Sequence, residues 1–414
     1  MQFALAERLA KFDARSTEYA SQFVDTLLRE AVQARASDVH IHPMEQGLEV
    51  RWRIDGVLLQ LGRFPRGAES DVVARLKVLA DLLTYRVDAP QEGRLRQAFE
   101  HAVDRQTINR VEMRVSTFPT LHGERVVVRL FATTNSFRLP EDLGMPPDVL
   151  DSLQQATSET SGAVVISGPA GSGKTTTAYA ILRAIVRDSA TLKSVVTLED
   201  PIESALDGVS QSQIQPAAGF TLATGLRSLL RQDPEVILVG EIRDAETAGA
   251  VFQAALTGHL VISTFHAGTA AEGIGRLREM GIESYLLQSG LQALLCQRLV
   301  RRLCTCAKPA NDVVQLLGLA IPLVEARIAS GCVRCQQTGY AGRLLLVESL
   351  ARGNGTLRGE LVRLSDTRAM QQAALEWGLV SLYERALQYA ARGETSPAEV
   401  RRVFGMTTQD NCKG

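Results

Sequence analysis

The chain has 414 residues, enough for two or three domains, and a formal net charge of −1. With 45% hydrophobic and 22% charged residues it can build ordinary globular cores, and it has no basic tail or Lys/Arg run that would indicate a nucleic-acid-binding protein. No apolar run is long enough to cross a membrane and the N-terminus has no signal-peptide pattern, so we expect a cytoplasmic enzyme.

Helix and strand patterns alternate in the first part of the chain. Residues 17–35 place Phe23, Val24 and Leu27 on one helical stripe, and a second amphipathic helix is expected at about 70–84. Period-2 alternation and flanking turn residues predict strands at 48–53, 57–59, 111–116 and 124–131. These elements predict an N-terminal α+β domain over residues 1–132.

Residues 133–145 contain polar side chains, Pro140 and Gly144, which predicts a linker. Strands then alternate with helices, so residues 146–300 should form an α/β core whose mainly parallel sheet is covered on both faces. The expected strands are 163–167, 194–198, 235–239 and 260–264. A cysteine-bearing insert is expected at 301–348, and a mostly helical region at 349–414.

The stretch from Gly168 to Thr175 fits the P-loop pattern G-x-x-x-x-G-K-[ST] between an apolar run and a helix-compatible segment. Backbone N–H groups of such a loop converge on phosphate oxygens at a helix N-terminus. Lys174 would reach the β- and γ-phosphates, and the Thr175 hydroxyl would hold Mg²⁺. The alternative is a plain glycine-rich turn. The expected nucleotide-binding residues are Gly168, Pro169, Ala170, Gly171, Ser172, Gly173, Lys174, Thr175 and Thr176.

Acidic residues follow two of the expected strands. Glu241 ends the 235–239 strand, where nucleotide enzymes keep a second Mg²⁺ or water contact. Glu199 and Glu203 lie in a second acidic cluster, which could position a water as a general base does. The alternative for Glu241 is an acid with no catalytic role, since many apolar strands end in one. The alternative for Glu199 and Glu203 is a solvated turn.

Two histidines, His259 and His266, flank the strand expected at 260–264. Histidines at the two ends of one strand could sense a phosphate. A packed or helix-capping role is the alternative for each of them.

These motifs occur in one order that resembles the Walker A, Asp box, Walker B and His box of the secretion-superfamily ATPases. They span residues 168–175, 199–203, 231–244 and 257–266. Members of this family are the cytoplasmic motors of type II secretion and type IV pilus assembly. Further segments resemble the family's N-terminal (N2, PAS-like) domain: 36–41, 53–56, 90–94 and 114–117. The similarity covers about residues 20 to 405.

The resemblance implies a RecA-like P-loop ATPase core and a homohexameric ring with ATP and Mg²⁺ between two domains. Glu203 first and Glu199 second would position or activate water, Glu241 would act at the Walker B site, and His259 and His266 would be γ-phosphate sensors. Arginines would reach the γ-phosphate on domain closure and stabilise transition-state charge. These arginines are Arg114 and Arg129 on the N-terminal domain. By the same resemblance, Arg227, Arg231 and Arg243 would lie near the nucleotide or the subunit boundary. For each arginine, a surface ion pair is the alternative.

Four cysteines form two pairs, Cys304 with Cys306 and Cys332 with Cys335, and their thiolates suit a tetrahedral zinc site. Free thiols in a vestigial insert are the alternative. The first pair is C-x-C, one residue shorter than the family's usual C-x-x-C. A module of this kind resembles assembly-type motors, since retraction motors of pili lack it. Cys412 and Cys296 look incidental, and Cys296 is expected on an amphipathic helix.

We therefore expect a hexameric ATPase that drives assembly of a type II secretion pseudopilus or a type IV pilus at the inner membrane. The alternatives are a pilus retraction ATPase, a RecA-like DNA translocase or helicase, and a scaffold that binds ATP without hydrolysing it. The expected partner is an inner-membrane docking protein, and no nucleic acid is expected. Assembly ATPases commonly carry a further N-terminal domain, for which the stretch ahead of the similar region is too short, so docking should differ or that domain be missing.

Overall fold

The structure is a computed structural model that describes residues 2–68, 71–95, 99–102, 108–131, 138–189, 192–353, 355–357 and 359–405. Residues 133–137 of the expected linker, and Cys412, lie outside the described residues. The chain forms two compact units, one built mainly from Met1–Thr134 and the other from Asn135–Gly331 and Gly339–Gly414.

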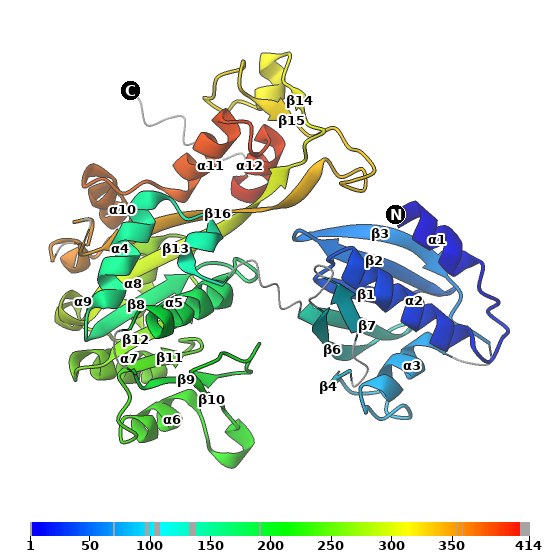
Figure 1. The fold of residues 1–414 in the computed structure, drawn as a ribbon, viewed down its shortest axis with the longest axis horizontal. Coiled ribbons are helices and arrows are strands. Elements are labelled where there is room, and N and C mark those ends of the chain that lie inside the picture. Colours follow the sequence, from blue (N-terminus) through cyan, green and yellow to red (C-terminus); the bar gives the residue numbers. More distant parts are fainter. Residues whose placement is uncertain are drawn as a thin grey trace. The chain divides into compact units, whose positions relative to one another are not determined.

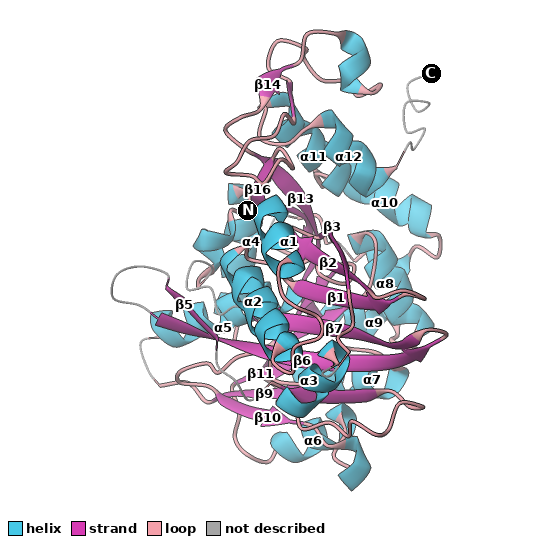
Figure 2. Cartoon of the chain, turned by 90° about the vertical axis from the view of Figure 1, so that its right-hand side faces the viewer, coloured by secondary structure: helices cyan, strands magenta, loops and turns pink. Residues whose placement is uncertain are grey.

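The N-terminal unit is an antiparallel sheet with helices on one face (Figure 2). The sequence predicts only that this part of the chain is α+β. The strand order is β3-β2-β1-β7-β6-β4, and β5 pairs with β6. The strands are β1 (Asp38–Pro43), β2 (Leu48–Ile54), β3 (Val57–Phe64), β4 (Gln91–Arg94), β5 (Phe99–Ala102), β6 (Ile108–Thr120) and β7 (Gly123–Phe131). The helices are α1 (Gln2–Ala10), α2 (Tyr19–Gln33) and α3 (Val72–Leu79).

Alternation along β6 and β7 separates an apolar face from a polar face. Met113 and Val128 point into the helix-covered core, whereas their neighbours Arg114 and Arg129 lie on the other face. Phe23 of α2 is completely buried in this core, which confirms the helical stripe predicted at 17–35.

The second unit is built around a sheet with the order β10-β9-β11-β12-β8-β13-β16 (Figure 1). All neighbouring pairs are parallel except the last, β13 with β16. The strands are β8 (Gly162–Ser167), β9 (Val195–Glu199), β10 (Ser210–Gln213), β11 (Val236–Val239), β12 (Leu260–Phe265), β13 (Leu291–Leu303) and β16 (Tyr340–Ala351). The four strands expected from the sequence correspond to β8, β9, β11 and β12.

Helices cover both faces of this sheet, and all six residues of β8 are buried for that reason. Val164 and Ile166 pack in a core with residues of α4 and α5, whereas Ala163 and Val165 pack in a second core with residues of α7 and α8. The α-helices are α4 (Pro147–Ser158), α5 (Lys174–Asp188), α6 (Leu222–Leu229), α7 (Ala245–Leu256), α8 (Ala270–Glu279), α9 (Ser284–Gly290), α10 (Thr367–Glu376), α11 (Leu382–Ala391) and α12 (Pro397–Phe404). Short 3₁₀ turns are η1 (Pro140–Leu143), η2 (Pro216–Ala218), η3 (Val313–Leu316) and η4 (Leu361–Arg363).

The segment around Cys296 corrects the sequence prediction. Cys296 lies in strand β13 and not on a helix, because β13 pairs with β8 on one side and β16 on the other. The expected insert at 301–348 also overlaps these two strands of the core sheet. The residues between β13 and β16 are 304–339, and they carry the short ladder of β14 (Lys308–Pro309) and β15 (Arg327–Ile328).

Within the described ranges, no helix combines the length and the apolar character that crossing a bilayer requires.

Candidate functional site

The P-loop connects β8 to α5 in the strand, loop and helix order that the motif requires. Gly168 has a φ of +147°, and a Cβ there would lie 2.4 Å from the carbonyl oxygen of Gln297 and 2.6 Å from Ser172 Oγ. Gly173, the residue before α5, has a φ of +89°. Only glycine fits both demands, close approach and left-handed backbone.

The N-terminus of α5 has the features of an anion site. In the described part of the chain, the amides of Gly173, Lys174 and Thr175 donate to no backbone carbonyl. They stand at the positive end of the helix dipole, so phosphate oxygens fit them.

Lys174 belongs to the same anion site. Its ammonium donates to the carbonyls of Gly168 at 3.0 Å and Pro169 at 3.2 Å. Burial lowers the pKa of Lys174, an effect that nearby Glu241 and Glu203 oppose.

A buried glutamine, which the sequence analysis did not identify, is hydrogen-bonded to the P-loop and to the first turn of α5. Gln297 of β13 is fully buried. Its Nε2 donates to the Ser172 carbonyl at 2.9 Å, and its Oε1 accepts from the Thr177 hydroxyl at 3.0 Å. Because β13 pairs with β8, the strand that leads into the P-loop, it brings Gln297 beneath the turn.

Acidic and basic side chains surround the P-loop at the carboxyl edge of the sheet. Glu203 Oε1 accepts from the Thr175 hydroxyl at 3.3 Å. Glu241, which follows β11, lies 2.8 Å from His266 Nε2 and 2.5 Å from Arg243 Nε. His266 follows β12. Parallel strands end at the same edge, so the end of β11, the end of β12 and the P-loop meet there.

His266 and Arg243 link these groups further. His266 Nδ1 lies 3.1 Å from the Gly168 carbonyl oxygen. The hydrogen bond to Glu241 raises the pKa of Arg243, and Arg243 also lies 3.6 Å from Asp200. The arrangement places oxygen ligands that suit Mg²⁺, the Thr175 hydroxyl and the carboxylates, beside cations that suit phosphate.

Glu199 is buried and only 3% exposed, and its carboxylate is already hydrogen-bonded. Oε1 accepts from the Thr197 hydroxyl at 2.6 Å and from Gln211 Nε2 at 3.0 Å, and Oε2 accepts from the Tyr179 hydroxyl.

His259 lies apart from the site within this chain. It precedes β12, and its Nδ1 contacts the Ala254 carbonyl at the end of α7 at 3.1 Å. The first residue of β12, Leu260, pairs with the first residue of β8, so His259 is a strand length of roughly 20 Å from the P-loop. The sequence suggests both histidines as γ-phosphate sensors, and of the two only His266 lies beside the P-loop within this chain.

Arg227 and Arg231 lie on the surface of α6 and the turn after it. Arg227 is 56% exposed on its side chain and pairs with Glu246 at 3.0 Å. Arg231 donates to the Arg227 carbonyl at 3.1 Å. This geometry corresponds to the surface ion pair that was the alternative for Arg227.

Arg114 and Arg129 are neighbours in the N-terminal sheet. They are paired across β6 and β7, and the same row continues to Arg94 of β4 and Asp38 of β1. Asp38 accepts from Arg129 at 3.1 Å and pairs with Arg53 at 3.5 Å. The polar face of this sheet thus carries a cationic row, with one carboxylate within it.

The sulfur atoms of Cys304, Cys306, Cys332 and Cys335 all lie within 4.8 Å of one another. Cys332 Sγ and Cys335 Sγ are 3.7 Å apart. Tetrahedral zinc with Zn–S bonds of about 2.3 Å needs sulfur separations of roughly 3.8 Å, so donor set and spacing fit zinc.

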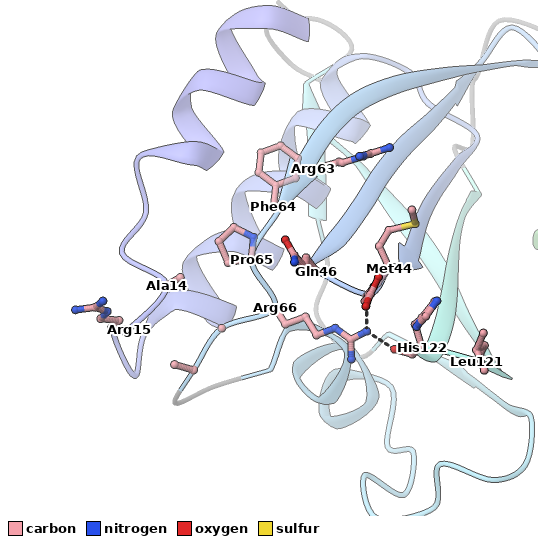
Figure 3. A pocket seen from close by; sticks show the side chains of 14 residues that line it. Ala14, Arg15, Met44, Gln46, Arg63, Phe64, Pro65, Arg66, Leu121 and His122 are labelled. Carbon is pink, nitrogen blue, oxygen red and sulfur yellow. Dashed lines mark hydrogen bonds between the residues drawn. The ribbon is translucent and has the colours of Figure 1, made fainter.

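The N-terminal unit has a surface groove of its own (Figure 3). Arg66 crosses it and donates to the carbonyls of Met44 and His122. The groove is lined by residues of this unit alone, and none of the P-loop or acidic-motif residues contributes to it.

A family model for the type II/IV secretion system protein matches residues 13–402. Type II secretion system protein E of Klebsiella pneumoniae is 39% identical over 424 residues, covering 99% of this chain and 82% of that protein. The type IV pilus assembly ATPase PilB of Thermus thermophilus is 40% identical over 388 residues, covering 92% of this chain. The chain spans only 42% of that longer protein.

Solved structures share the fold at lower identity. The ATPase DotB of Legionella pneumophila superposes with a TM-score of 0.68 at 21% identity, covering 95% of this chain and 98% of that one. The pilus retraction motor PilT with bound ADP superposes with a TM-score of 0.58 at 23% identity, covering 94% of this chain and 96% of that one. These confirm the RecA-like fold class, while the family match confirms the resemblance. The chain belongs to the type II/IV secretion system protein family and is, by family, a secretion ATPase.

Proposed function

We propose that this chain hydrolyses ATP at the P-loop and, as a homohexamer, converts hydrolysis into movement of its two units. The motion would power assembly of a type II secretion pseudopilus or a type IV pilus. The observation that carries the proposal is the meeting of Thr175, Glu203, Glu241 and His266 around the P-loop at one edge of the sheet.

The side chains divide the work by their chemistry. The loop amides and Lys174 would bind the phosphates, and Thr175 with the carboxylates of Glu203 and Glu241 would hold Mg²⁺ and orient the attacking water. A bound Mg²⁺ would supply charge neutralisation between the β- and γ-phosphates. His266 lies where it could sense the γ-phosphate, since it contacts the Gly168 carbonyl oxygen and Glu241.

The arginine row of the N-terminal unit suits coupling of hydrolysis to motion. Arg114 and Arg129 are held in register on a rigid sheet, so both would arrive at an anion together. Cations that reach the γ-phosphate only on closure would stabilise the spread charge of the transition state and tie the chemical step to movement.

The cysteine cluster is proposed to hold one structural Zn²⁺. The regular structure of residues 304–339 is one short β-ladder and one 3₁₀ turn, so a metal would stabilise a segment that has little core of its own. Because assembly-type motors carry such a module, the cluster favours assembly over retraction. The chain would work in the cytoplasm, bound to the inner membrane through a docking protein.

Phosphate release by the purified, magnesium-supplied chain tests the proposal. Wild type should release phosphate, whereas Lys174→Ala should lose ATP binding and Glu203→Gln and Glu241→Gln should bind ATP with little turnover. Glu159→Gln, on the exposed end of α4, is the matched control and should behave as wild type. Light scattering with a non-hydrolysed ATP analogue should give the mass of six chains.

Other results would support other functions. A chain that binds ATP while Glu203→Gln, Glu241→Gln and wild type release equally little phosphate would be a nucleotide-gated scaffold. Tight DNA binding that weakens steeply with salt would indicate a DNA translocase. In the source cells, the Lys174→Ala allele should abolish secretion or piliation, whereas pili that form but fail to retract would indicate a retraction motor.

A further inference from the structure

The acidic loop that carries Glu203 is fastened by side chains at both of its ends. At its start, Glu199 closes β9 as a buried residue whose carboxylate accepts from three donors: Thr197, Gln211 and Tyr179. A carboxylate with these partners has its oxygens directed toward fixed protein donors and away from a water at the P-loop.

Tyr179 connects this carboxylate to Glu203. It lies on α5, little more than one helical turn after Lys174, and is 4% exposed. Its hydroxyl donates to Glu199 and accepts from the Glu203 N–H at 3.3 Å. Burial and the bond to Glu199 raise the pKa of Tyr179, so the hydroxyl keeps its proton and remains a donor.

Gln211 of β10 holds the other part of the loop. Its Nε2 donates to Glu199 at 3.0 Å and to the Ser204 carbonyl at 3.1 Å. Its Oε1 accepts from the Leu206 N–H at 2.7 Å. The backbone on both sides of Glu203 is thus hydrogen-bonded, and its carboxylate faces the Thr175 hydroxyl at 3.3 Å.

We propose that Tyr179, Glu199 and Gln211 are positioning residues that hold the acidic loop so that Glu203 faces Thr175, and that Glu199 itself accepts no proton from water. This rests on the proposed function, in which Glu203 acts on the water or Mg²⁺ of bound ATP. The set also ties the loop to α5, the helix that begins with Lys174, so the phosphate cradle and the carboxylate keep a fixed separation.

The test compares turnover and nucleotide affinity in the full-length chain. Tyr179→Phe removes both hydroxyl bonds and should lower kcat roughly 10–100-fold, because small misplacements of a catalytic group cost that much. The Kd for a fluorescent ATP analogue should change less than about twofold, since the phosphate-binding groups are intact. Tyr285→Phe, an exposed tyrosine on α9, is the control and should match wild type.

Glu199→Gln separates positioning from catalysis. Glutamine keeps an acceptor for Thr197 and Gln211, and its amide can donate to the Tyr179 oxygen. Glu199→Gln should therefore retain at least about ten times the kcat of Glu203→Gln, with the pH profile of wild type. A general base at this position would instead make the two variants equally inactive.

Gln211→Leu, on the edge strand β10, serves if Tyr179→Phe does not fold, and should lower kcat roughly 3–10-fold at unchanged affinity. Wild-type kcat in a folded Tyr179→Phe, or in Gln211→Leu, would overturn the inference, as would equal inactivity of Glu199→Gln and Glu203→Gln. If wild type itself releases no phosphate, the proposed function fails. That outcome is distinct from an active wild type with an unaffected Tyr179→Phe.

Discussion

The Nε2 atom of His266 lies 2.8 Å from Oε1 of Glu241. The other ring nitrogen lies 3.1 Å from the carbonyl oxygen of Gly168. Both neighbours are acceptors, so both contacts are hydrogen bonds only when both ring nitrogens carry hydrogen. The imidazole therefore joins the ends of β11 and β12 to the first residue of the P-loop.

His266→Gln should lower kcat about 10–100-fold and change ATP affinity less, because Lys174 and the loop amides still bind the phosphates. Phosphate release and equilibrium binding of an ATP analogue measure the two effects. The same substitution at His259, at the far end of β12, should cost less in turnover. Equal losses at the two histidines would contradict the placement of His266 alone beside the P-loop.

Gln297→Leu should weaken both stability and nucleotide binding. The substitution leaves the Ser172 carbonyl and the Thr177 hydroxyl without their buried partner, which costs about 1–3 kcal/mol for each unsatisfied group. The expected readouts are a lower thermal midpoint and a higher Kd for ATP. The control is Arg302→Gln, at an exposed position of the same strand, which should change neither the thermal midpoint nor the Kd. An unaltered Kd in Gln297→Leu would show that the P-loop keeps its shape without the glutamine.

The nucleotide motifs could be predicted from sequence because their information is local. The glycines of the P-loop and the acid after β11 each follow a short apolar strand. The carboxyl ends of parallel strands lie at the same edge of a sheet, so these residues are expected close together. Gln297 could not be predicted, since its partners Ser172 and Thr177 lie far away in the chain and β13 was expected as a helix. The mixed apolar and polar stretch 291–303 fits either a helical or a strand period, and pairing with β8 and β16 decides in favour of the strand.

Lys77 and Glu124 form a buried ion pair inside the N-terminal unit, with side chains 1% and 6% exposed. The ammonium also donates to the Arg86 carbonyl at 2.8 Å. Glu124→Gln should destabilise the chain by about 3–5 kcal/mol, because it strands a buried cation. Lys77→Met with Glu124→Leu should recover much of that loss in urea unfolding. If the double variant were less stable than Glu124→Gln, the ion pair would stabilise the N-terminal unit more than an apolar pair at the same site can.

Metal analysis of the purified chain should find about one zinc per chain, and Cys335→Ser should lose it. The thermal midpoint should fall on treatment with a chelator, and zinc should leave as the pH drops, because protons compete for the thiolates. Cys296→Ala, a cysteine outside the cluster, should keep the metal. Wild-type protein with four reactive thiols and no metal would mean that the cluster is a set of free thiols.

Glu399 predicts a pH dependence of stability. Its side chain is fully buried and accepts from Arg301 at 2.7 Å and from Arg402 at 2.6 Å, which ties α12 to β13. Burial alone would raise the pKa of this carboxyl, but the hydrogen bonds from Arg402 and Arg301 outweigh it and lower the pKa. The folded chain therefore binds this proton more weakly than the unfolded chain, whose carboxyl has a pKa of about 4.3.

The sign of the effect follows from that difference. The contribution of Glu399 is fully present above the unfolded-state pKa and is lost as the pH falls through the lower folded-state pKa. Glu399→Gln should lower the free energy of urea unfolding at pH 7 by about 1–3 kcal/mol, because the partly exposed Arg301 and Arg402 lose their charged hydrogen-bond acceptor. The difference in unfolding free energy between Glu399→Gln and wild type should become smaller below about pH 4. The control is Glu246→Gln, which breaks only the exposed pair with Arg227 and should change the unfolding free energy little at either pH. If the difference between Glu399→Gln and wild type were the same at both pH values, the carboxylate charge would not be what stabilises α12.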